Sequence, residues 1–105
     1  MPNPSCETIL QWLKSMGENV DPEGTTGAIC ARFVERASRC GFSCEMVRLP
    51  GDGIREYEVR WAHFGSVFVG FKQPPPQPSA DDALLVGCEA LLANDWCRAR
   101  LRPGG

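Results

Sequence analysis

Apolar and charged residues alternate most regularly in the middle of the chain, between residues 42 and 72. Tyr57, Val59 and Trp61 alternate there with charged residues, which is the period of two expected for a half-buried strand. The segments before and after residues 42–72 are predicted to be helices. The turn at 49–53 (LPGDG) contains a proline and two glycines, which supply the dihedral angles of a tight turn. The pattern predicts a three-stranded antiparallel meander.

The second turn of the meander decides which residues oppose each other. A three-residue loop His63-Phe64-Gly65 lets Gly65 take the left-handed conformation that such loops need. A two-residue loop would instead set charged residues of the second strand against Val69 and Phe71. A shift of the register by one residue moves all side chains of a strand to the opposite face of the sheet. We expect the three-residue loop, because with it every apolar residue opposes an apolar residue. One face then holds Tyr57, Val59, Trp61, Val67, Val69 and Phe71, and the other holds Glu56, Glu58, Arg60 and Phe68. In the first strand, the residues that share a face are Phe42, Cys44 and Met46.

Helical spacing of apolar residues predicts a short amphipathic helix at 5–16, with Ser5 as its N-cap and Trp12 at the edge of its apolar face. Gly17 suits the position just after its end. A helix of about 12 residues is not stable alone in water, so it must pack on the rest of the chain. Residues 17–24 form a linker with turn-forming residues.

A second and a third helix flank the predicted meander. Thr25 or Thr26 is expected to cap the second, which ends at Gly41. Ser79 and Asp82 form a capping box for the third. The apolar stripe of the second helix consists of Ala28, Ile29, Cys30, Phe33, Val34 and Ala37. The stripe of the third consists of Leu84, Leu85, Cys88, Leu91 and Leu92.

Proline and arginine mark the remaining segments. The connector at 73–78 (QPPPQP) cannot continue a sheet, and we interpret it as an arm that carries the chain back across the sheet, rather than as a ligand for an SH3-type partner. The tail at 98–105 is basic, with Arg98, Arg100 and Arg102. Fraying of this terminus and contact with phosphate both remain open.

Together these elements predict an α+β fold in the order α-α-β-β-β-α. A length of 105 residues suits a single domain over 1–105, with its core at 25–93. The net charge of -2 provides no basic field for nucleic acid. We find no signal peptide pattern and no apolar stretch near the roughly 18 residues of a membrane span, so a cytoplasmic location in a host cell is expected, without membrane contact.

Six cysteines are many for this length. Secretion is not indicated, there is no CxxC spacing, and His63 is the one histidine. We therefore expect reduced cysteines that act as small core residues, with a zinc site or disulfides as alternatives, and we expect no metal and no cofactor. The cysteines are Cys6, Cys30, Cys40, Cys44, Cys88 and Cys97.

The order of elements gives one resemblance to a known family, and the sequence itself gives another. Without the first helix it resembles the topology of double-stranded-RNA-binding domains. In those domains lysines at the start of the last helix grip phosphates, whereas residues 79–82 (SADD) would repel them here. Three further pieces of sequence are GAICARFVERASRCGFSCEM, YEVRWAHFGSVFVGF and ADDALLVGCEALLA. Over about residues 27–93 they are similar in sequence to small phage domains of the "ABA sandwich" type.

The phage resemblance implies an accessory protein of a phage or mobile element. We therefore expect a non-enzymatic protein that binds and inhibits a host protein or protein complex, most specifically an anti-defence inhibitor of the anti-CRISPR kind. Exposed aromatic and arginine residues are the usual anchors of such surfaces. The candidates are Trp12, Arg55, Arg60, Phe64, Phe68 and Trp96.

Other functions remain as alternatives. Nucleic acid is not an expected partner, but a nucleic-acid-binding module would use the arginines of the second helix or the tail. A homodimeric structural protein would use a sheet edge or face. Catalysis is not expected, because His63 near Cys40 and Cys44 lacks an orienting third group. The polar sheet face could meet solvent, the first helix or a partner.

Overall fold

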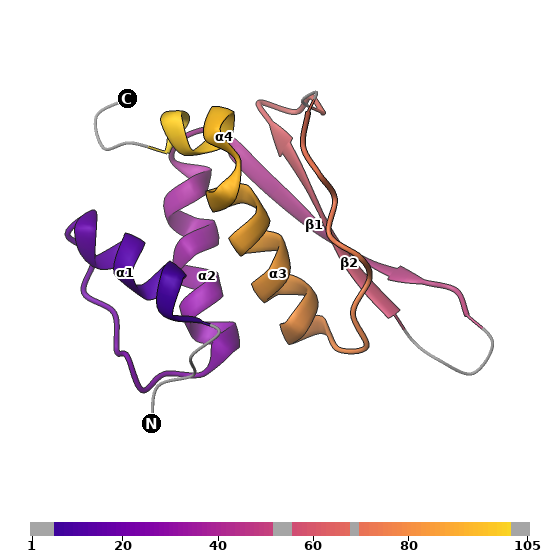
Figure 1. The fold of residues 1–105 in the computed structure, drawn as a ribbon, viewed down its shortest axis with the longest axis horizontal. Coiled ribbons are helices and arrows are strands. Elements are labelled where there is room, and N and C mark those ends of the chain that lie inside the picture. Colours follow the sequence, from indigo (N-terminus) through magenta and orange to yellow (C-terminus); the bar gives the residue numbers. More distant parts are fainter. Residues whose placement is uncertain (1–5, 52–55, 68–69, 102–105) are drawn as a thin grey trace.

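The computed structural model describes residues 6–51, 56–67 and 70–101. In this part of the chain, four helices and a two-stranded antiparallel sheet form an α+β fold. The elements in order are α1 (Glu7–Ser15), α2 (Thr26–Ser38), β1 (Phe42–Leu49), β2 (Glu56–His63), α3 (Ala80–Ala93) and α4 (Asp95–Arg100). Helices α2 and α3 form the middle layer, with α1 on one side and the β1–β2 hairpin on the other (Figure 1).

Side-chain caps begin the two long helices where the sequence predicted them. The Thr25 hydroxyl accepts a hydrogen bond from the Ala28 N–H at 3.2 Å, and the Ser79 hydroxyl accepts one from the Asp82 N–H at 3.1 Å. Gly17 follows α1 with a φ of 80°, as expected of a residue that ends a helix in the left-handed conformation. The predicted cap Ser5 lies outside the described residues.

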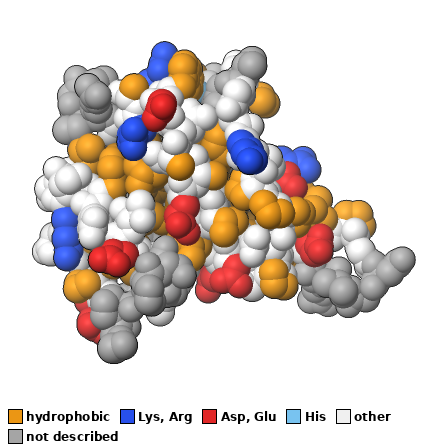
Figure 2. Space-filling model, viewed as in Figure 1, with side chains coloured by type: hydrophobic (Ala, Val, Ile, Leu, Met, Phe, Trp, Pro, Cys, Tyr) orange, Lys and Arg blue, Asp and Glu red, His pale blue; other side chains and the backbone are white. Residues whose placement is uncertain are grey.

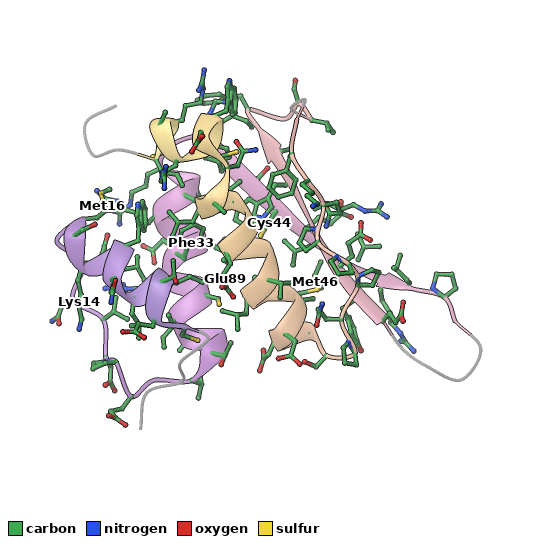
Figure 3. The ribbon with its side chains drawn as sticks, viewed as in Figure 1. Lys14, Met16, Phe33, Cys44, Met46 and Glu89 are labelled. Carbon is green, nitrogen blue, oxygen red and sulfur yellow. The ribbon has the colours of Figure 1, made fainter. Side chains whose placement is uncertain are left out.

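Phe33 of α2 is the centre of the core and connects the three layers (Figure 3). Its ring makes an edge contact with Trp12 of α1 at 5.2 Å and another with Trp61 of β2 at 6.3 Å between centroids. The Trp61 indole N–H donates to the Gly87 carbonyl of α3 at 3.0 Å. The buried tryptophan therefore has its polar atom satisfied, and one aromatic row runs from α1 to the sheet.

The hairpin confirms the predicted faces of the first two strands. Phe42 opposes His63, Cys44 opposes Trp61 and Met46 opposes Val59. Residues opposite each other in antiparallel strands share a face, and this one packs on α2 and α3. The outer face carries Ser43, Glu45, Val47 and Leu49 from β1 and Glu56, Glu58, Arg60 and Ala62 from β2.

The described residues of the predicted third strand do not form one, and the predicted three-residue loop before it is wrong. His63 and Ser66 exchange backbone hydrogen bonds of 2.9 and 3.1 Å around a two-residue turn. Both turn residues, Phe64 and Gly65, have positive φ values of 49° and 80°, which is typical of the type I′ hairpin turn. Val67, expected on the apolar face, is 87% exposed. Phe68 and Val69 lie outside the described residues.

Instead of a third strand, the connector follows the edge of β2 back to the start of α3. Tyr57 and Gln77 exchange backbone hydrogen bonds of 2.8 and 2.9 Å, and the Gln73 side chain donates to the Val59 carbonyl at 2.8 Å. The three prolines at 74–76 have no N–H to contribute to a ladder, so regular pairing cannot spread between these two points. The connector thus carries the chain back along the sheet as predicted, but it is held by isolated hydrogen bonds rather than by a regular ladder.

The structure settles two open points about the ends of the chain for the residues it describes. Part of the predicted tail forms α4, with Cys97 and the following Leu101 fully buried. Asn94 caps it by accepting a hydrogen bond from the Cys97 N–H at 3.0 Å. Residues 102–105 lie outside the described part. Helix α1 packs on α2 and α3 rather than on the polar sheet face. All four described helices lie on the other side of the hairpin from that face (Figure 1).

Four cysteines, Cys6, Cys30, Cys88 and Cys97, are buried in the core, as predicted for small apolar residues. Cys40 and Cys44 are half-buried, and all six carry free thiols. Within the described segments, no helix has both the length and the apolar character needed to cross a membrane.

Candidate protein-binding surface

Two of the predicted anchors, Phe64 and Trp96, come together at one end of the hairpin. They lie on either side of His63, with ring centroids 4.5 Å and 5.3 Å from the imidazole. Phe64 is 79% exposed and Trp96 is 40% exposed. We call His63, Phe64, Trp96 and Arg100 the aromatic tip. The two anchors are far apart in sequence, so the tertiary fold alone brings them together.

The backbone holds Phe64 in an unusual conformation. Among the described residues other than glycine, only Phe64 has a positive φ, at 49°. Its N–H donates to the Gly41 carbonyl at 2.8 Å, and its ring lies against the Gly41 backbone. This contact is possible because Gly41, with a φ of 91°, has no side chain to occupy the space. The turn therefore presents a rigidly backed aromatic ring to solvent.

Helix α4 supplies the other half of the tip. The Arg100 guanidinium stacks on the Trp96 ring, with its central carbon 3.6 Å from the ring centroid, and it donates to the Trp96 carbonyl at 2.9 Å. No described carboxylate forms an ion pair with Arg100. Phe42 lies beneath, with its ring 4.5 Å from His63 and 6.5 Å from Trp96. The tip thus combines apolar rings with a positive charge that no described carboxylate neutralises.

The arrangement around His63 is not that of a nucleophile and its base. The imidazole Nε2 donates to the Cys40 backbone carbonyl at 3.1 Å rather than meeting a thiol. Burial raises the pKa of the Cys44 thiol, which is the opposite of nucleophile activation. In this part of the molecule the imidazole therefore supports the tip by packing and hydrogen bonding.

The other predicted anchors lie elsewhere. Arg60 is on the outer sheet face, where it donates to Glu58 at 2.9 Å. Trp12 lines a groove between α1 and the α3–α4 corner. Arg55 and Phe68 lie outside the described residues. Of the four described candidates, two therefore lie together at the aromatic tip, and the other two lie at separate places on the surface.

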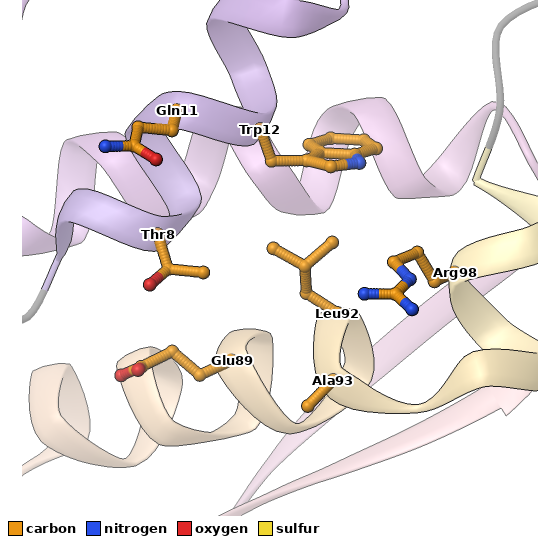
Figure 4. A pocket seen from close by; sticks show the side chains of 7 residues that line it. All are labelled: Thr8, Gln11, Trp12, Glu89, Leu92, Ala93 and Arg98. Carbon is orange, nitrogen blue, oxygen red and sulfur yellow. The ribbon is translucent and has the colours of Figure 1, made fainter.

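The groove at Trp12 has a volume of about 580 Å³ and a mostly apolar floor. Trp12 and Leu92 face each other across it, with Arg98 at one end and Glu89 below Thr8 at the other (Figure 4). Arg98 is paired with Asp95 at 3.0 Å. Burial raises the pKa of the Glu89 carboxyl. The residues that line the groove are Thr8, Gln11, Trp12, Glu89, Leu92, Ala93 and Arg98.

The arginines of α2 are largely paired with carboxylates. Glu18, from the linker after α1, accepts a hydrogen bond from Arg36 at 3.2 Å and lies 3.7 Å from Arg32 and 3.9 Å from Arg39. Arg39 also pairs with Glu35 at 3.3 Å. On the face seen in Figure 2, basic side chains are scattered among acidic and apolar ones rather than gathered in one patch. This geometry does not favour a phosphate-binding surface on α2.

Sequence reasoning missed the roles of His63 and Arg100 in the tip. A signal for α4 was present, because Asn94 precedes Asp95 and buried residues follow at a spacing of four, as in a capped amphipathic turn. No local sequence pattern predicts the contact between α4 and the hairpin, because Trp96 and His63 are far apart in sequence.

No group of three or more histidine, cysteine or acidic side chains that could hold a metal ion occurs among the described residues. We compared the chain with protein-family models, with curated proteins and with solved structures, and none of the three comparisons gave a match.

Proposed function

We propose that this chain is a non-enzymatic protein-binding module that uses the aromatic tip to occupy a surface of a host protein or protein complex and thereby inhibit it. The observation that carries this proposal is the exposed Phe64 ring, held by a backbone with positive φ. An anti-defence inhibitor of the anti-CRISPR kind is the specific form, and it rests on the phage resemblance alone.

The argument from Phe64 is energetic. A left-handed backbone costs a bulky L-residue roughly 1–2 kcal/mol, whereas glycine and asparagine adopt it readily. The ring is 79% exposed, so its contact with Gly41 recovers little apolar burial within the chain. Residues that the surrounding structure holds in strained conformations cluster at functional sites. Burial of the ring in a partner would explain its presence.

The tip also indicates what kind of surface it would bind. Phe64 and Trp96 suit a shallow apolar pocket, since aromatic anchors dominate the energetics of many interfaces. Arg100 lacks a described carboxylate partner, so a partner with an acidic side chain beside the pocket would complement its charge. The proposed target surface is therefore apolar with an acidic rim.

Phe64→Asn tests the proposal, because asparagine suits the turn but removes the ring. We expect its free energy of unfolding to stay within about 1 kcal/mol of wild type. Its affinity for a partner captured from host lysate by the wild-type chain should fall by roughly 30-fold, as for loss of a hot spot. Calorimetry with the purified partner measures this affinity.

The matched control is Val67→Thr, which removes an exposed apolar side chain from the same hairpin end but outside the tip. It should bind as wild type does. Equal binding by wild type, Phe64→Asn and Trp96→Ala would overturn the role of the tip. The anti-defence form is tested separately, by asking whether the wild-type chain, but not Phe64→Asn, restores plasmid transformation in a host with active CRISPR immunity.

A further inference from the structure

The two edges of the sheet differ, and the hydrogen bonds of β2 show which backbone groups face each edge. Tyr57 bonds to Gln77, the Val59 carbonyl accepts from Gln73, and His63 bonds to Ser66. Alternate residues of a strand direct their backbone groups to the same side, so all three point away from β1. This side of β2 is therefore occupied by the connector.

The same alternation identifies the open groups of β1. Arg48 opposes Tyr57 and Met46 opposes Val59, so these are the pairs that exchange no hydrogen bonds within the hairpin. The backbone N–H and C=O groups of Cys44, Met46 and Arg48 thus point to the free side of β1. No described group hydrogen-bonds to them there.

Of the usual protections against pairing, this edge has only two charged side chains, Glu45 and Arg48. Between Phe42 and Leu49 the strand has no proline, no lysine and no bulge, and it pairs residue for residue over eight positions. Met46 lies on the helix side of the sheet and is 40% exposed (Figure 3). An open edge with an exposed apolar side chain at its middle is a template for another strand.

We propose that the partner at this edge is β1 of a second copy, which pairs antiparallel about a two-fold axis at Met46 to give a continuous four-stranded sheet. In this register Met46 bonds to the partner's Met46, and Cys44 and Arg48 exchange bonds across the axis. The two exposed Met46 side chains then bury each other. Such an interface uses the same patch on both subunits, as two-fold symmetry requires.

Neighbouring registers are worse. Centring on Glu45 sets two carboxylates directly opposite each other, which is unfavourable. Centring on Val47 pairs Cys44 with Pro50, which has no N–H. Centring on Cys44 pairs Arg48 with Cys40, whose N–H is already bonded to Ala37. In the Met46 register no carboxylates oppose each other and no N–H that is already bonded is needed. Pro50 opposes Phe42 there, at the end of the paired segment and outside the three central bonded pairs. The two aromatic tips then lie at opposite ends of the joined sheet.

Met46→Pro tests the edge. The Met46 N–H bonds to nothing in the hairpin, so proline removes only a bond of the dimer, whereas Met46→Thr keeps the N–H and serves as control. Sedimentation equilibrium over a range of concentrations should show wild type and Met46→Thr as dimers and Met46→Pro as a monomer. Circular dichroism should show that Met46→Pro is folded. A monomeric wild type, or a Met46→Pro variant that still dimerises, would overturn the proposal.

A second pair of variants tests the register and does not depend on folding of the proline variant. In the proposed dimer Val47 opposes Glu45 of the other copy, and Leu49 opposes Ser43. Val47→Glu and Leu49→Glu both place a carboxylate opposite a glutamate of β2, so their effects within the hairpin match. Only Val47→Glu adds repulsion across the dimer, and it should raise the dimer Kd roughly tenfold more than Leu49→Glu. Equal effects would exclude this register.

Discussion

The ring of Phe64 lies against the backbone of Gly41, and the Phe64 N–H donates to the Gly41 carbonyl at 2.8 Å. This contact joins the segment between α2 and β1 to the turn that follows β2, at the open end of the hairpin. It also explains how a residue that is poorly suited to positive φ keeps that conformation. The position of the aromatic tip therefore depends on a glycine that precedes β1.

Gly41→Ala should lower both stability and partner binding. A methyl group would lie 2.5 Å from the Phe64 ring, on a backbone with a φ of 91°. Gly17→Ala is the control, because Gly17 has a similar φ of 80° but open space around it, so it carries the backbone penalty alone. We expect each to lose roughly 1–2 kcal/mol from the backbone, and Gly41→Ala to lose more. Urea unfolding measures the difference, and equal losses would contradict the contact.

Gly87→Ala should destabilise the protein although alanine favours helix. In α3 the added methyl would lie 2.9 Å from the Val59 Cβ, at the contact between α3 and β2. Overpacking of this kind costs about 1–3 kcal/mol, against a gain of about 1 kcal/mol in helix propensity. A double-mutant cycle with Val59→Ala should show favourable but partial coupling, because alanine removes the Val59 Cγ1, 3.0 Å from the added methyl, and keeps the Cβ. Additive losses would argue against this steric contact.

Replacement of Glu89 should make stability less dependent on pH. Burial in the groove raises its folded pKa above the usual 4.5, so the folded state favours the protonated form. The resulting contribution to stability is complete below the unfolded pKa and is lost as pH rises through the folded pKa. Glu89→Gln should therefore be more stable than wild type at neutral pH, with the gap closing below about pH 4. Glu7→Gln, at an exposed position of α1, provides the baseline for thermal unfolding across pH.

The cysteines should differ in reactivity toward iodoacetamide. Burial raises the pKa of Cys97 to about 11, and the hydrogen bond with Cys30 together with burial raises the pKa of Cys88. In the native protein at about pH 8, we expect the half-buried Cys40 to react first and these buried thiols to stay unmodified. Peptide mass mapping measures the sites, with denatured protein as the fully labelled control. Early labelling of Cys88 would show that the core opens.

Local patterns were enough to predict most elements. Thr25 and Ser79 cap their helices as expected, since a cap depends on a hydroxyl and an N–H only three residues away. The alternation of Tyr57, Val59 and Trp61 identified both β2 and its buried face. The tip was found only in part, because Phe64 and Trp96 were candidates as single exposed aromatics and nothing local connected them.

The sequence by itself determined where helices and the first two strands form and which of their faces are buried, because capping and periodicity act within a few residues. Only the tertiary structure decided the turn at Phe64, the fate of the third strand and the packing of α4. Each depends on atoms distant in sequence: the carbonyl of Gly41, the single bonded pair between Tyr57 and Gln77, and the contact of Trp96 with His63. Apolar pairing favoured a third strand, whereas the chain closes the edge of β2 with isolated bonds from Gln73 and Gln77, because the prolines between them have no N–H groups to extend a ladder.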